Sequence, residues 1–213
     1  MLKSLPTYAG RYGWYLAVSF LLTVLTTNLC LASERTTWPK LVASKDSSLI
    51  SYQQHSESGT VDLLLVHGWN CDSRYWQEQI PFLSQRYRVT TLDLAGHGHS
   101  GQKREKYTMR SFGEDVQSVV EAIGSDKVIL IGHSMGGAVI AEAARLMPDK
   151  VIGLVGVDCL EDVEYPLTQQ DYEAMMAPFQ QNFKTALRDF VMPMLRPETA
   201  QPLKEWIIND MAA

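Results

Sequence analysis

The chain has 213 residues, of which 46% are hydrophobic and 20% are charged. These proportions are those of an ordinary globular protein, and they exclude an intrinsically disordered chain. The formal net charge of -5, without any run of Lys and Arg, makes nucleic acid a poor partner.

Residues 1–32 differ in character from the rest of the chain. Lys3 and Arg11 are the only charges in this segment, an apolar run follows them, and small residues end it at Ala32. This order predicts a secretory signal peptide that is cleaved after Ala32, and hence an exported protein, periplasmic or secreted. The alternative is an uncleaved membrane anchor at residues 14–32, and only then would we expect the protein to contact a membrane.

From residue 33 onward, strand patterns and helix patterns alternate. Residues 62–66 and 127–131 are continuous apolar runs, which are typical of strands that are covered on both faces. Residues 48–52 alternate apolar and polar side chains, as an edge strand does. Strands that alternate with helices predict the α/β class, with a doubly wound and mostly parallel sheet. The predicted elements of this part are strands at 48–52, 62–66, 88–92, 127–131 and 151–157 and helices at 73–85, 109–123 and 135–147.

Residues 165–213 contain no pattern of a buried strand. Apolar side chains recur at helical spacing over residues 172–190, and residues 203–211 predict a second helix, with prolines between the two. We therefore expect two parts after the N-terminal segment: an α/β core over residues 33–164 and a helical segment over residues 165–213.

Cys71 and Cys159 follow predicted strands at the same end of the sheet. In an oxidising compartment they could form a disulfide. However, their strands are expected to lie two positions apart at about 4.8 Å per step, which is long for disulfide geometry. Two buried free thiols are the alternative.

A nucleophile pattern lies between the predicted strand at 127–131 and the helix that follows it. Gly132-His133-Ser134-Met135-Gly136 fits the pattern G-x-S-x-G. The glycines permit a turn that is too tight for larger side chains, and such a turn exposes the serine hydroxyl at the end of the sheet. The N-terminal amides of the following helix stabilise negative charge at the same place. We therefore predict that Ser134 is a catalytic nucleophile.

A second turn supports this prediction. His67, Gly68 and Trp69 follow the buried strand at 62–66. In acyl transfer the carbonyl oxygen gains negative charge, and N–H groups held in place stabilise it by roughly 3 to 4 kcal/mol each. We predict that the backbone amides of Trp69 and Met135 are these oxyanion donors, and that His67 packs beneath the site as a turn residue.

His97 and His99 alternate with glycines after the strand at 88–92, a spacing that suggests a metal site. A zinc site needs three or four ligands, and no carboxylate or cysteine set accompanies these histidines at a recognised spacing. We interpret this stretch as a glycine-rich connection. We therefore expect neither a metal ion nor another cofactor.

Three motifs of the sequence belong together. They are Val66-His67-Gly68-Trp69, Asp93-Leu94-Ala95-Gly96-His97-Gly98-His99-Ser100 and Gly132-His133-Ser134-Met135-Gly136-Gly137. In this order and on these elements, the motifs resemble the α/β-hydrolase superfamily. The resemblance covers residues 48–158 closely and the helical segment only in type, because many members carry a helical cap there. It implies a cap at residues 165–213 and an esterase-like serine hydrolase that acts on an ester or similar acyl bond of a small, apolar substrate.

The resemblance also raises a question about the catalytic base. In this superfamily the nucleophile is followed along the chain by an acid and then by a histidine. All five histidines of this sequence precede Ser134. The resemblance therefore implies that the last strands, the histidine and the usual acid are missing from these 213 residues.

Asp158 is the one candidate for the acid within the chain, because some members place the acid at the end of the strand before the cap. The alternative interpretation of Asp158 is a strand-terminal residue that accepts hydrogen bonds from loop amides. Two functions stay open: a serine hydrolase, and a truncated or non-catalytic binding protein of α/β-hydrolase type that lacks the triad histidine.

Overall fold

The computed structural model describes residues 38–212, except residues 58, 160–163 and 165. The predicted signal peptide, like its alternative of a membrane anchor, lies outside the described residues. Within the described part, no helix has the length and apolar character needed to span a membrane. The division into a core and a helical segment at residue 164 stays a prediction.

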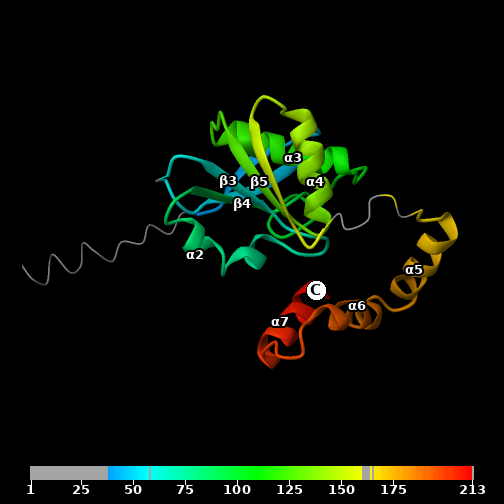
Figure 1. The fold of residues 1–213 in the computed structure, drawn as a ribbon. Helices are drawn as coiled ribbons and strands as arrows, with labels where there is room; N and C mark the ends of the chain where they lie inside the picture. The colour runs from blue at the N-terminus through cyan, green and yellow to red at the C-terminus, as the bar shows by residue number, and fades with distance from the viewer. Residues whose placement is uncertain (1–37, 58, 160–163, 165, 213) are drawn as a thin grey trace, which may run out of the picture. The chain divides into compact units, whose positions relative to one another are not determined.

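The core is a six-stranded sheet in the order β1-β2-β4-β3-β5-β6 (Figure 1). Strands β3, β4, β5 and β6 run parallel to one another, whereas β2 pairs antiparallel with both β1 and β4. The prediction of a mostly parallel α/β sheet is therefore confirmed. The strands are β1 (Lys40–Ala43), β2 (Leu49–Gln54), β3 (Asp62–Val66), β4 (Arg88–Leu92), β5 (Val128–His133) and β6 (Val151–Val157).

Helices cover both faces of this sheet (Figure 1). Successive side chains of a strand point to opposite faces, so Leu64 and Val66 pack in one core while Leu63 and Leu65 pack in another. The first core is closed by α3 and α4, and the second by η1 and α2. The helices are η1 (Ser73–Trp76), α2 (Ile80–Leu83), α3 (Met109–Ala122), α4 (Met135–Leu146), α5 (Gln169–Gln181), α6 (Phe183–Val191), η2 (Met192–Met194) and α7 (Gln201–Met211).

The first turn of α3 shows why its sequence forms a helix there. The Thr108 side chain accepts a hydrogen bond from the Ser111 amide, and the Ser111 side chain accepts one from the Thr108 amide. This capping box satisfies amides that have no partner within the helix. Phe112, Val116 and Val119 then fall on the buried face, at the spacing of an amphipathic helix.

The predicted edge strand at residues 48–52 is wrong in its position. It forms β2, but β1 pairs with it and takes the edge of the sheet. β1 has only four residues, and most of its side chains are exposed. A strand so short and exposed carries no apolar alternation from which it could be predicted.

Two predicted helices are each divided in the structure. Residues 73–85 form η1 and α2, because Pro81 cannot donate the backbone hydrogen bond of a helix interior and instead occupies the first turn of α2. Residues 172–190 form α5 and α6, which meet at Asn182. The backbone of Asn182 is extended, and its side chain accepts a hydrogen bond from the Thr185 amide at 3.2 Å. Asn182 thus caps the start of α6.

Candidate active site

Ser134 occupies a strained turn between β5 and α4. Its backbone has φ 53° and ψ -120°, in the left-handed region that non-glycine residues rarely adopt. Two backbone hydrogen bonds hold the turn: the Ser134 amide donates to the Val157 carbonyl at 3.0 Å, and the Gly137 amide donates to the Ser134 carbonyl at 2.9 Å. Strain of this kind persists only where the surrounding structure fixes it, and it is concentrated at functional sites.

The two glycines that flank this turn are required by close packing. A Cβ atom on Gly132 would collide with the carbonyl group of Gly136. A Cβ atom on Gly136 would lie 2.6 Å from the Val66 carbonyl oxygen and 2.7 Å from that of His67. The start of α4 therefore lies directly against the end of β3, which brings the two predicted site turns together.

The turn after β3 passes beside the candidate nucleophile. A Cβ atom on Gly68 would lie 3.1 Å from the Cβ atom of Ser134. Among the described residues, the backbone amides of Trp69 and Met135 have no hydrogen-bond acceptor. Met135 is the first residue of α4, where an amide has no acceptor within the helix. The structure thus brings Ser134 close to the turn that carries Trp69, while the role of both amides as oxyanion donors stays a prediction.

His67 lies beneath the site and does not face Ser134. Its side chain is buried, with Nδ1 at 2.8 Å from the Gly68 carbonyl oxygen and Nε2 at 3.0 Å from the Leu94 amide. Burial lowers the pKa of His67 to about 4. A neutral ring with both nitrogens occupied joins two loops and is not free to accept a proton from a serine.

The loop after β4 is organised around Asp93, which is buried. Its carboxylate accepts hydrogen bonds from the amides of Ser73 at 2.8 Å and His99 at 2.9 Å. Gly98 has a positive φ and lies so close to Asp93 that a Cβ atom would collide with the carboxylate. In the described part of the chain, His, Cys, Asp and Glu form no cluster of three or more suited to a metal ion.

Asp158 follows β6 with a positive φ of 50°. Burial lowers the pKa of His133, and the negative charge of Asp158 opposes this effect. Within the described residues, neither the Ser134 hydroxyl nor the Asp158 carboxylate forms a hydrogen bond with a histidine. The described residues therefore do not complete a Ser-His-Asp triad, and Asp158 as the acid stays a prediction.

The two cysteines are free thiols in the structure. Cys71 is buried against Leu187, Val191 and Met211 of the helical segment. Cys159 is only partly buried, with its Sγ atom 3.9 Å from the Gly132 carbonyl oxygen.

An aromatic cluster lies at the turn that carries Trp69. The Trp69 ring lies 5.7 Å from the ring of Phe179, 6.4 Å from that of Phe183 and 6.5 Å from that of Phe190, mostly edge to face. The helical spacing of these phenylalanines is visible in the sequence, and it allowed either a pocket lined together with Trp69 or plain packing of the helices on the sheet. The Trp69 side chain remains 38% exposed, so the cluster is open to solvent.

Residues 63–203 match the model of a protein family that is described as the alpha/beta hydrolase fold. The chain belongs to this family. The resemblance of the three motifs to α/β-hydrolases is therefore confirmed, and the matched range includes both site turns and most of the helical segment.

Relatives and solved structures within the alpha/beta hydrolase fold include several esterases. The chain is 38% identical over 106 residues to a pimeloyl-acyl-carrier-protein methyl ester esterase of Aliivibrio fischeri. The aligned region covers 50% of this chain and 39% of that protein. A putative aryl esterase from Burkholderia cenocepacia is similar in structure, with a TM-score of 0.69, 26% identity, and 82% and 67% of the two chains covered. An esterase from Exiguobacterium antarcticum has a TM-score of 0.74 at 20% identity, covering 82% and 68%, and shows the fold alone. The match to the first relative spans about two fifths of that protein's length.

Proposed function

We propose that the protein is a serine hydrolase that cleaves an ester or similar acyl bond of a small, apolar molecule. The observation that carries this proposal is the strained backbone of Ser134, which stands between β5 and α4 beside the turn that carries Trp69. The esterase names of several relatives support the same class of reaction.

In the proposed mechanism, the Ser134 hydroxyl oxygen attacks the carbonyl carbon of the ester as its proton passes to a base. The carbonyl oxygen becomes an oxyanion, which accepts hydrogen bonds from the amides of Trp69 and Met135. Collapse of the tetrahedral intermediate expels the alcohol and leaves an acyl group on Ser134. Water then attacks the acyl group, releases the acid and restores the serine.

The base for this reaction is the open part of the mechanism. A histidine is the usual base for a serine nucleophile. Within the described residues no histidine is hydrogen-bonded to Ser134, so the base is not identified there, and a binding protein without catalysis is the second candidate.

The aromatic cluster of Trp69, Phe179, Phe183 and Phe190 supports an apolar substrate. These rings lie next to the amide that would hold the oxyanion, so the acyl or alcohol group of a bound ester would contact them. Aromatic rings bury large apolar areas and leave few polar groups unsatisfied. We expect esters with apolar or aromatic groups to react faster than charged esters.

Labelling with a fluorophosphonate tests the proposed function. The reagent should phosphonylate the protein at Ser134, and Ser134→Ala should abolish the labelling, while Ser118→Ala, on the buried face of α3, should retain it. Because imidazole is small enough to act as a diffusible base, adding it should accelerate the labelling of Ser134. A folded protein that stays unlabelled with and without imidazole would favour the binding protein.

We also propose that the protein is exported, on the basis of the sequence of residues 1–32 alone. The mass of the mature protein from its native host tests this proposal. A chain that begins at Ser33 would support a cleaved signal peptide, and an intact Met1 in a membrane fraction would support the anchor.

A further inference from the structure

Asn70 joins the candidate oxyanion turn to α7, 141 residues further along the chain. Its backbone is left-handed, with φ 57°, and its side-chain amide donates a hydrogen bond to the Met211 carbonyl in the last turn of α7. Glycine and asparagine are the residues that adopt this backbone most readily. Asparagine adds a donor that glycine lacks, and here that donor reaches α7.

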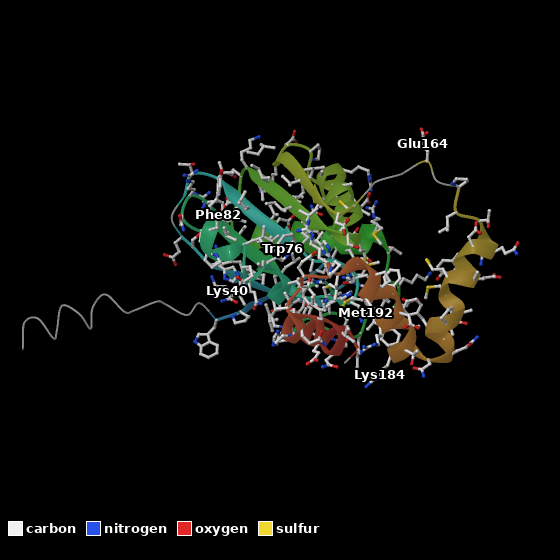
Figure 2. All side chains as sticks on the ribbon, turned by 60° about the horizontal axis from the view of Figure 1, so that its bottom comes forward. Lys40, Trp76, Phe82, Glu164, Lys184 and Met192 are labelled. Atoms are coloured by element: carbon white, nitrogen blue, oxygen red, sulfur yellow. The ribbon has the colours of Figure 1, made fainter. Side chains whose placement is uncertain are left out.

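Arg74 forms a second connection to α7. It belongs to η1, the short helix that ends at Trp76, which is labelled in Figure 2. Its guanidinium pairs with Asp72 at 2.6 Å and also with Asp210 of α7. It stands over the ring of Trp206, whose centroid is 5.7 Å away. Burial alone would raise the pKa of Asp72, but the hydrogen bonds from Arg74 outweigh burial and hold it below its usual range. The pair is therefore charged at neutral pH.

Apolar contacts complete the junction. Cys71 is buried against Met211 and Leu187, and the ring of Tyr75 lies 4.9 Å from that of Trp206. On its other side, the turn is held by a hydrogen bond from the Ser73 amide to Asp93. The helical segment thus contacts the turn at each of Trp69, Asn70, Cys71, Arg74 and Tyr75.

We propose that Asn70 is a positioning residue for the Trp69 amide and that the last turn of α7 anchors it. The Trp69 amide lies between Gly68, which packs against Ser134, and Asn70, which is bound to Met211. With both neighbours fixed, the N–H group of Trp69 keeps one direction before an oxyanion forms. This inference rests on the proposed function, because the direction of that N–H group matters only for acyl transfer.

The variant Asn70→Gly tests the inference, since glycine keeps the left-handed backbone and removes only the side-chain donor. We expect phosphonylation of Ser134 to slow by about tenfold or more, because loss of one oxyanion donor costs about a hundredfold or more. Asn70→Asp, which cannot donate to the Met211 carbonyl, should slow it similarly. Glu205→Ala is the matched control, because among the described residues Glu205 pairs with Gln201 of the same helix and with no residue of the turn. It should leave the rate unchanged.

A second pair of measurements does not require a reactive serine and uses the Ser134→Ala background. Burial raises the pKa of the Cys71 thiol to about 12, so the docked thiol should react slowly with iodoacetamide. Asn70→Gly should speed this reaction several-fold and lower the ¹H–¹⁵N heteronuclear NOE of the Trp69 amide, while that of Met135 stays high.

The results separate the two proposals. A wild-type protein that is never phosphonylated counts against the proposed function alone, and the NOE and Cys71 alkylation then decide the inference. If Asn70→Gly lowers thermal stability but leaves the Trp69 NOE and the phosphonylation rate unchanged, Asn70 is merely structural and the inference is overturned.

Discussion

The backbone amide of Leu94 donates a hydrogen bond to Nε2 of His67 at 3.0 Å. Because Nε2 accepts this bond, the ring proton resides on Nδ1, which lies 2.8 Å from the Gly68 carbonyl oxygen. An uncharged imidazole therefore joins the loop after β4 to the turn that passes beside Ser134. The stability of the site should depend on this ring staying neutral.

The pH dependence of unfolding tests this role of His67. Burial lowers the pKa of the folded ring from 6.5 to about 4, so the unfolded chain binds a proton in this window while the folded protein does not. The free energy of unfolding should thus fall as the pH decreases from about 6.5 to about 4, by about 3 kcal/mol for this group. Urea unfolding at several pH values between about 6.5 and about 4 measures this change in the free energy of unfolding. His67→Gln should lose this part of the slope, and an unchanged slope would contradict the assignment.

Gly136→Ala should destabilise the fold by about 1–3 kcal/mol or more, because the new methyl group would collide with two backbone carbonyls that cannot move aside. Gly153→Ala is the control, since a methyl group there would meet only the Ile129 side chain at an ordinary 3.5 Å. Thermal or urea unfolding of both variants compares them. Equal stability of the two would argue against the close packing of α4 on β3.

Arg104→Met should cost about 3–5 kcal/mol, because it leaves the buried carboxylate of Asp115 without its ionic partner. Asp115 would keep only its hydrogen bonds from Ser44 and the Ala95 amide. The matched control is Arg145→Met, which breaks an exposed pair with Glu142 and should leave stability nearly unchanged. Urea unfolding of the two variants measures the difference in their free energies of unfolding. Similar losses of stability in both would refute the importance of the buried pair.

The 213-residue chain should self-associate through β6. This strand is the last in the described sheet, and Leu154 is 48% exposed on it, with other apolar side chains exposed on both faces. Unpaired apolar edges bind other edges. Leu154→Lys should lower the association seen by light scattering. Phe82→Lys, which removes an even more exposed apolar side chain, at 70%, from α2, should not. If both variants lowered the association equally, it would result from general surface hydrophobicity and not from β6.

The sequence allowed most of the sheet to be predicted, because buried strands carry a signal of their own. β3 and β5 are continuous apolar runs, and α3 has one apolar face and a capping residue at its start. β1 could not be predicted, because its four residues are mostly exposed and show no apolar periodicity. The division between α5 and α6 at Asn182 could not be predicted either. The apolar spacing continues across this residue, and the cap of α6 depends on its single side chain.

The tight turn at Ser134 could be predicted because its constraints are local, while its role as a nucleophile stays a prediction. Gly132, Ser134 and Gly136 lie within five residues, and their spacing reflects the geometry of one turn. The link from Asn70 to Met211 could not be predicted, because it depends on how α7 folds back across the chain. The aromatic cluster on Trp69 has the same origin: its rings come from separate elements, and only the folded chain joins them.

The strained backbone of Ser134 should also lower the thermal stability of the protein. Holding a non-glycine residue in this region costs on the order of 1–3 kcal/mol, which Ser134→Gly would release. The substituted protein should therefore melt at a higher temperature than the parent.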